Sequence, residues 1–114
     1  MKNQVQLFKF HKAEVRTAMI NGKPYFVGRD VAKALGYKRI AKAISDHVDE
    51  RDIMVSKLGT KKGEREAKYI SESGMYSLIM VSKLDSAKEF QHWVTNEVLP
   101  SLRQTGSYQL KPMS

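Results

Sequence analysis

The sequence has no cysteine, which excludes disulfide bonds and metal sites built on thiolates. No hydrophobic run is long enough to cross a membrane, and the first residues lack the apolar segment of a signal peptide. Acidic residues are also few: 12 Asp and Glu stand against 20 Lys and Arg, so the formal net charge is +8. We therefore expect a protein without a membrane segment that is stabilised by packing alone and attracted to polyanions.

Motifs for catalysis and metal binding are missing as well. The three histidines, His11, His47 and His92, form neither an i, i+4 pair nor another spacing typical of metal ligands. The stretch 28–30 lacks the spaced glycines and the Lys-Ser/Thr pair of a phosphate-binding loop, and no Gly-x-Ser-x-Gly sequence presents a nucleophile. We expect no enzyme, no metal and no other cofactor.

What the sequence does contain fits one small domain. Its 114 residues are 41% hydrophobic, enough for a modest core. Lys and Arg outnumber acids by five to one in residues 1–28 and by eleven to seven in residues 29–68, whereas residues 69–114 hold four of each. We expect a domain over residues 1–108, and residues 109–114 as a disordered tail or the start of a linker.

The last third of the chain, residues 69–106, has hydrophobic residues at helical spacing. Ser71 or Ser73 can cap a first helix, and a second helix should begin at residue 85 or 86. Pro100 lacks a backbone N–H, so it should end this helix or begin a new turn. The apolar stripe of the second helix comprises Ala87, Phe90, Trp93, Val94 and Leu99. Such a stripe predicts a helical pair that forms half of the core.

The first third predicts strands. A short strand is expected over Val5–Phe8, with Lys9 outside it. Asn21-Gly22 is the strongest two-residue hairpin signal, because both positions tolerate positive φ. A hairpin should therefore span Glu14–Val27, with Pro24 at the start of its second strand, where proline is tolerated.

Two short helices should follow this hairpin. Asp30 is placed to cap the first helix, and Gly36 is the expected residue after its end. The second helix is expected over Ile40–Val48. Two short helices joined by a tight turn that contains glycine resemble a helix-turn-helix, whose second helix enters the major groove. An ordinary helical hairpin with a solvated basic face is the alternative.

A second hairpin is expected over residues 53–70. Its strands would include Ile53–Val55 and Ala67–Ile70, and its tip would be the Lys- and Gly-rich stretch Gly59–Gly63. Beside the helical unit, such a hairpin has the shape of a wing that lies along the phosphate backbone. A flexible polar loop is the other interpretation.

The cations of these two units are the candidate nucleic-acid-binding residues. Lys and Arg at the start of the second helix can contact phosphates or guanine edges, and those of the hairpin can hold the backbone. The candidates are Arg29, Lys33, Lys38, Arg39, Lys42, Lys57, Lys61, Lys62 and Lys68.

Two separate stretches carry a family resemblance. YFVGRDVAKALGY and SGMYSLIMVSKLDSAKEFQHWVTNEVLPSLRQTGSY together resemble the Bro-N domain of phage antirepressors and viral Bro proteins. The family pattern falls on Phe26, Val27, Asp30, Val31, Leu35, Gly36, Tyr37, Trp93, Val94, Val98, Leu99 and Pro100. The resemblance implies a compact α+β module, DNA binding and a phage or prophage setting, and hence the cytoplasm of a bacterial host cell.

The fold class we predict is therefore α+β: short β-hairpins and a helix-turn-helix-like unit packed on two C-terminal helices. The function we predict is a double-stranded-DNA-binding module of an antirepressor in the lysis–lysogeny switch. A module that binds and inactivates a phage repressor protein without contacting DNA is the alternative. A homo-oligomer formed through the C-terminal helices is a further hypothesis.

Overall fold

The computed structural model describes residues 5–60, 62–82 and 84–107, which form a mixed α+β fold. The strands are β1 (Val5–Phe10), β2 (Ala13–Ile20), β3 (Lys23–Val27), β4 (Ile53–Thr60) and β5 (Gly63–Ser71). The helices are α1 (Gly28–Ala34), α2 (Ile40–His47), α3 (Glu72–Val81), α4 (Ala87–Trp93) and α5 (Leu99–Ser107), with a 3₁₀ turn η1 (Glu50–Asp52) and a π-helical turn η2 (Val94–Val98). The α+β class predicted from the sequence is confirmed.

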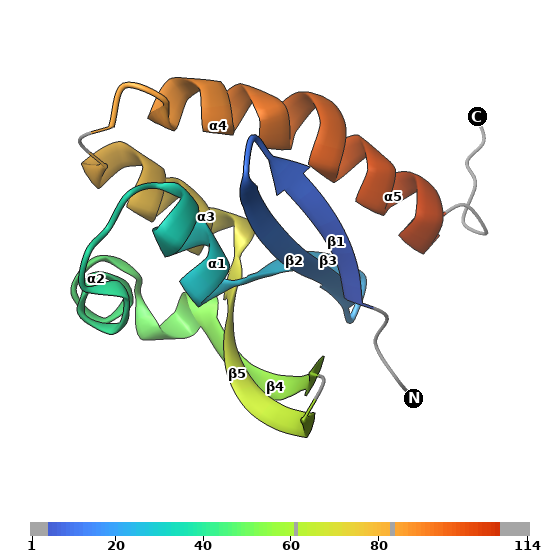
Figure 1. Cartoon of the computed structure of the whole chain (residues 1–114). Helices are drawn as coiled ribbons and strands as arrows, with labels where there is room; N and C mark the ends of the chain where they lie inside the picture. Colours follow the sequence, from blue (N-terminus) through green and yellow to red (C-terminus); the bar gives the residue numbers. More distant parts are fainter. Residues whose placement is uncertain (1–4, 61, 83, 108–114) are drawn as a thin grey trace.

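The five strands form one antiparallel sheet in the order β1-β2-β3-β5-β4. Figure 1 shows the β4–β5 hairpin projecting from the rest of the sheet, at the bottom of the view. The projection follows from unequal pairing: β3 pairs with β5 at three positions only, from Tyr69 to Ser71, whereas β4 pairs with β5 along its whole length.

The first hairpin forms where the sequence predicted it. Asn21 and Gly22 have φ values of 54° and 78°, as a two-residue turn with positive φ at both positions requires. β1 is longer than expected, because it continues through Lys9 to Phe10 and turns at His11, whose φ is also positive at 54°.

The two helices predicted after this hairpin are confirmed, but the role expected for Asp30 was wrong. Asp30 does not cap α1; the helix begins at Gly28, and the Asp30 side chain bonds to Arg16 instead. At the other end, Gly36 has a φ of 82°, and its N–H and that of Tyr37 donate to carbonyls of the last turn, as in a Schellman motif. A helix-turn-helix that enters a major groove stays a prediction.

The two C-terminal helices are confirmed as well. Of the two candidate caps, Ser71 is the one used, because its hydroxyl accepts a hydrogen bond from the N–H of Gly74. α4, η2 and α5 follow one another as a continuous rod at the top of Figure 1. Pro100 therefore does not end the helix. In η2 the N–H of Leu99 donates to the carbonyl of Val94, five residues back, and this wider turn comes just before the proline.

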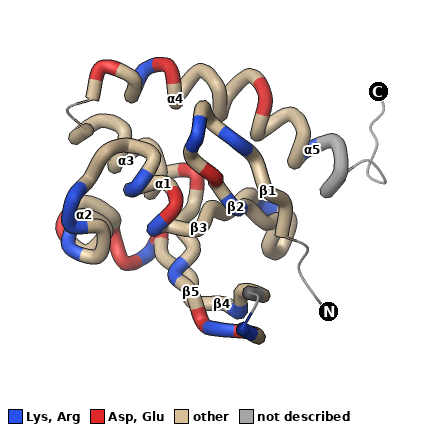
Figure 2. Tube along the Cα trace, in the orientation of Figure 1, with Lys and Arg blue, Asp and Glu red and all other residues tan. Residues whose placement is uncertain are grey.

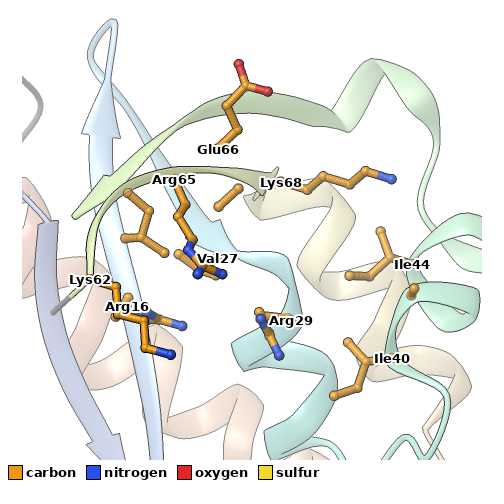
Figure 3. Close-up of a pocket in the computed structure, with 12 residues that line it drawn as sticks. Arg16, Val27, Arg29, Ile40, Ile44, Lys62, Arg65, Glu66 and Lys68 are labelled. Carbon is orange, nitrogen blue, oxygen red and sulfur yellow. The ribbon is translucent and has the colours of Figure 1, made fainter. Parts of the chain in front are cut away.

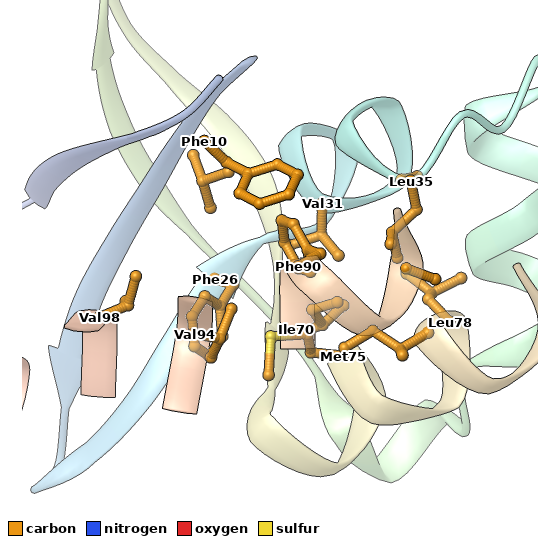
Figure 4. Packing of buried hydrophobic residues seen from close by; sticks show 14 of the residues in the cluster. Phe10, Phe26, Val31, Leu35, Ile70, Met75, Leu78, Phe90, Val94 and Val98 are labelled. Carbon is orange, nitrogen blue, oxygen red and sulfur yellow. The ribbon is translucent and has the colours of Figure 1, made fainter. Parts of the chain in front are cut away.

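The main core lies between the helices and one face of β1–β3 (Figure 4). Phe26 from β3, Val31 from α1, Met75 from α3 and Phe90 from α4 are each fully buried there. Trp93, which we expected in the core, is partly buried and packs against it. This core fixes α1 and α3 against the sheet.

A second, smaller cluster lies on the other face of the sheet. It consists of Ala18 and Ile20 from β2, Val27 from β3, Leu58 from β4 and Tyr69 from β5. The hydroxyl of Tyr69 donates a hydrogen bond of 3.0 Å to the carbonyl of Lys57. The cluster holds the base of the β4–β5 hairpin, which therefore forms a wall beside α1 and α2.

The described residues contain neither a membrane-spanning helix nor a cluster of metal ligands. None of their helices has the length and apolar character needed to cross a membrane. Among the same residues, no group of three or more His, Cys, Asp or Glu side chains is placed to hold a metal ion. The predicted tail, residues 109–114, lies outside the residues that the structure describes.

Candidate nucleic-acid interface

A cleft of ≈ 640 Å³ separates the β4–β5 hairpin from α1 and α2 (Figure 3). Five of its lining residues are cationic and one, Glu66, is acidic. The cations are Arg16, Arg29, Lys62, Arg65 and Lys68. They come from β2, α1, the hairpin turn and β5, so the fold brings together charges that lie up to 52 residues apart in sequence.

The apolar part of the cleft comes from both walls. Ile40, Ala41 and Ile44 line it from α2, and Leu58 and Ala67 line it from the hairpin. A cationic rim beside an apolar wall suits an elongated polyanion, because its charged groups can meet the rim while its less polar parts cover the wall.

Strand register decides which hairpin cations point into the cleft. Arg65 lies opposite Leu58 and therefore on the same face of the hairpin as this buried residue. Figure 3 shows the side chains of Arg16, Arg29 and Arg65 directed into the same space, and that of Glu66 directed away from it. The three guanidinium groups are thus the centre of the site.

Arg16 is held in place by Asp30. Its Nε and Nη2 donate hydrogen bonds of 2.7 and 2.8 Å to the two carboxylate oxygens of Asp30, and its backbone N–H donates another of 2.9 Å. These hydrogen bonds raise the pKa of Arg16. The paired Arg16 carries less net charge into the cleft than Arg29 or Arg65, which form no ion pair with any residue that the structure describes.

Three predicted residues line this cleft, namely Arg29, Lys62 and Lys68. Lys61 lies outside the described residues. The remaining predicted residues are not part of the cleft lining: Lys33 lies on α1, Lys38 and Arg39 precede α2, Lys42 is on α2, and Lys57 is on β4.

Two of these outlying lysines have acidic partners. The Nζ of Lys42 lies 3.0 Å from Asp46, one helical turn on, and the Nζ of Lys57 lies 4.0 Å from Glu64 on the outer face of the hairpin. Figure 2 shows segments of both signs on α2 and on the hairpin. The positive charge therefore does not cover one face uniformly, and among the described residues Arg29 and Arg65 bring cations without an ion pair into the cleft.

Arg16 and Arg65 are the site residues that the prediction missed. Arg16 stands in an alternating strand whose two faces both carry apolar residues, so its direction could not be read from the sequence. Arg65 lies within the hairpin predicted over residues 53–70, but only the register of β4 against β5 shows that it points inward. The pairing of Leu58 with Arg65 was the missing information.

Comparison with known proteins identifies one family. The model of the BRO family, N-terminal domain, matches residues 14–100. An uncharacterized protein of Haemophilus influenzae is 37% identical over 115 residues, which cover 98% of this chain and 57% of that protein. No solved structure matches the chain.

Viral proteins named for a Bro-N domain are similar as well. One from Invertebrate iridescent virus 6 is 38% identical over an alignment of 116 residues, which covers 86% of this chain and 28% of that protein. Another, from Autographa californica nuclear polyhedrosis virus, is 37% identical over an alignment of 99 residues, which covers 73% of this chain and 30% of that protein. The chain thus spans just over half of its bacterial relative and under a third of these viral ones.

Proposed function

The chain belongs to the BRO family, whose N-terminal domain it carries, and from this premise we propose that it binds double-stranded DNA through the cationic cleft. One observation supports the proposal above the others. Arg16, Arg29 and Arg65 come from three different elements and point into one space with an apolar wall. Guanidinium groups bind phosphate oxygens in a bidentate manner, so Arg29 and Arg65, with Arg16 beside them, are suited to a sugar-phosphate backbone.

The proposed contacts divide into two kinds. The cleft would hold one strand's phosphates, which gives affinity without sequence preference. Lys38, Arg39 and Lys42 lie at the start of α2, where they could reach base edges in the adjacent major groove. Lys57 and Lys61 would be peripheral backbone contacts.

A salt titration with matched variants tests this proposal. The double variant Arg29→Gln/Arg65→Gln removes two cleft cations, and Lys12→Gln/Lys88→Gln removes two exposed lysines from the β1–β2 turn and from α4. Both variants have the same net charge. For a cleft interface, the first variant should lower the slope of log K against log salt by about 2, because about 0.9 counterions are released for each phosphate contact.

The control variant should retain most of the wild-type slope. Equal losses in both variants would mean that binding follows total charge and not the cleft. Undetectable binding of the wild-type protein to duplex DNA would reject the proposal outright. Thermal unfolding of each variant checks that the substitutions leave the fold intact.

We further propose that this DNA binding serves an antirepressor of a phage or prophage, in the cytoplasm of its bacterial host. The relatives from invertebrate viruses support a viral origin of the domain, and the relative from Haemophilus influenzae supports a bacterial host. A phage repressor protein is the second partner we propose, and its binding can be tested by pull-down with nuclease present. Sizing chromatography addresses the homo-oligomer proposed through the C-terminal helices.

A further inference from the structure

β5 has an open edge over part of its length. β3 pairs with β5 at Tyr69, Ile70 and Ser71, and then leaves the sheet at Gly28 to begin α1. β4 continues to pair with β5 on the opposite edge as far as Gly63. Among the described residues, the stretch Glu64–Lys68 therefore has a strand beside it on one edge only.

This open edge faces the cationic cleft. The cleft is lined by the consecutive residues Glu66, Ala67 and Lys68, although the side chains of consecutive strand residues point to opposite faces. A cleft that meets all three must run along the edge of the strand. In addition, a Cβ placed on Gly28 would lie 3.3 Å from the backbone oxygen of Lys68, so this carbonyl points toward the start of α1.

The direction of the other main-chain groups follows from this carbonyl. Along an antiparallel strand, the N–H and C=O of one residue point to the same edge, and successive residues alternate between edges. The main-chain groups of Glu66 and Glu64 therefore point to the same side as those of Lys68. The groups of Arg65 and Ala67 point toward β4, with which β5 pairs.

We infer that this edge accepts an extended acidic segment of a protein partner as an additional strand. An open strand edge supplies main-chain donors and acceptors in register for a peptide, and the neighbouring side chains select its sequence. The stretch Glu64–Lys68 is about 16 Å long, enough for about five residues at about 3.3 Å each. The five cleft cations favour carboxylates, and Val27, Ile44 and Leu58 favour apolar side chains at alternate positions.

The occupant we infer is a peptide because of the main-chain edge. A nucleic acid could use the same cations, but it has no main-chain amides to pair with the backbone of Glu66 and Lys68. Where the proposed DNA binding holds, the two ligands would compete for one cleft, and an acidic partner would release the protein from DNA. This competition rests on the proposed function, whereas binding of the peptide itself does not.

Amide exchange followed by NMR tests the inference directly. The probe is the six-residue peptide acetyl-(Glu-Val)₃-amide, added to the intact protein without DNA. Strand addition should slow hydrogen exchange at the amides of Glu64, Glu66 and Lys68. The exchange rates of the Arg65 and Ala67 amides should be the same with and without peptide. A control peptide of the same sequence, N-methylated at alternate residues, should cause no such protection.

A pair of variants separates the main chain from the side chains. Glu66→Pro removes the side-chain charge and the edge N–H, whereas Glu66→Ala removes only the charge. Proline is tolerated at strand edges where its missing N–H has no strand partner, so both variants should fold. We expect the proline variant to bind the peptide at least about tenfold more weakly than the alanine variant, the equivalent of one lost hydrogen bond. The two variants should bind DNA alike.

The outcomes are distinct. Uniform protection, no peptide binding, or equal peptide affinity of the two variants would overturn the inference and leave DNA binding untouched. The same amides could instead be protected without peptide, with protection that rises with protein concentration. That result would assign the edge to a second copy of the chain and would also overturn the inference. If DNA binding alone is absent, the proposed function fails while the peptide site stands. If the proline variant does not fold, the N-methylated peptide still decides the question.

Discussion

Asp30 in α1 accepts three hydrogen bonds from Arg16 in β2, fourteen residues earlier in the sequence. Two come from the guanidinium group and one from the backbone N–H of Arg16, at 2.7 to 2.9 Å. Asp30 is only 8% exposed, so these donors replace the water that its carboxylate has lost. The pair joins β2 to the first turn of α1 and fixes one guanidinium at the wall of the cleft.

The variant Asp30→Asn should therefore change both DNA binding and stability. Its net charge rises by one, which alone would strengthen DNA binding. The loss of the carboxylate releases Arg16 from its fixed position, and we expect weaker DNA binding at all salt concentrations. Stability should fall by about 2–4 kcal/mol, because a buried charged partner is lost. Chemical denaturation and duplex titration measure the two effects.

Glu66→Gln is the matched control for that substitution. It also removes one negative charge from the cleft lining, but the side chain of Glu66 points away from the cleft and holds no arginine there. We expect slightly tighter DNA binding from this variant. If Asp30→Asn also binds more tightly, the ion pair has no positioning role and acts only through charge.

Glycine substitutions should separate backbone strain from steric overlap. Gly36 has a φ of 82°, and a Cβ there would lie 2.5 Å from Cδ1 of Leu84, whereas Gly22 has a φ of 78° with nothing within 4 Å of such a Cβ. Gly22→Ala should cost about 1–2 kcal/mol for the left-handed backbone alone. Gly36→Ala should cost more, because Leu84 must also move. Equal costs in thermal or chemical unfolding would show that Leu84 yields freely.

Gly59→Ala completes that series. Gly59 has no positive φ, and nothing lies within 4 Å of an added Cβ. The substitution should therefore change stability little, or raise it by about 0.4–1 kcal/mol through the unfolded chain. A large loss at Gly59 would mean that the β4–β5 hairpin needs glycine for a reason other than its backbone angles.

Tyr37 joins the turn after α1 to α3. Its hydroxyl donates a hydrogen bond of 2.7 Å to the carbonyl of Leu78, and burial raises the pKa of Tyr37. Tyr37→Phe removes this hydrogen bond, but the carbonyl still accepts one from the N–H of Ser82, so the variant should cost about 1 kcal/mol. Ser77→Ala is a suitable control, since it removes a hydroxyl bond to Ser73 within α3 only, at an exposed position. Urea unfolding of both variants measures the difference.

The features that the sequence predicted are those with local causes. Asn21-Gly22 and Gly36 adopt the positive φ that their turns need, and Ser71 caps the next helix through an N–H three residues on. Each of these residues acts on its own backbone or on a group at most three residues away. The elements of the fold could therefore be placed before any tertiary contact was known.

The cleft could not be predicted in the same way, because its causes are tertiary. Asp30 has the residue type and position of an N-cap, yet Arg16, fourteen residues earlier, binds its carboxylate. Arg65 and Lys57 are both cations of one hairpin, and only the strand register sends the first inward and the second outward. Charge counts along the sequence carry no information on register, so the prediction included Lys57, which points outward, and omitted Arg65, which points inward.

The ion pair between Asp49 and Arg51, at the turn before β4, should make the stability of the protein depend on pH. The side chain of Arg51 donates hydrogen bonds of 3.1 and 3.0 Å to the two oxygens of Asp49, and its backbone N–H donates another of 2.8 Å. These bonds favour the ionised carboxylate and lower the pKa of Asp49 from 3.8 to about 2. Because the folded pKa is the lower one, the stabilising effect is fully present above pH 3.8 and is lost as the pH falls through about 2.

The carboxyl ¹³C shift of Asp49, followed by NMR titration, should report a midpoint near 2 in the wild-type protein. In Arg51→Met, which keeps the backbone bond but loses the guanidinium, the midpoint should rise toward 3.8 without reaching it, since the side-chain bond is the largest cause of the shift. A midpoint that stays near 2 in this variant would assign the shift to the backbone of the η1 turn.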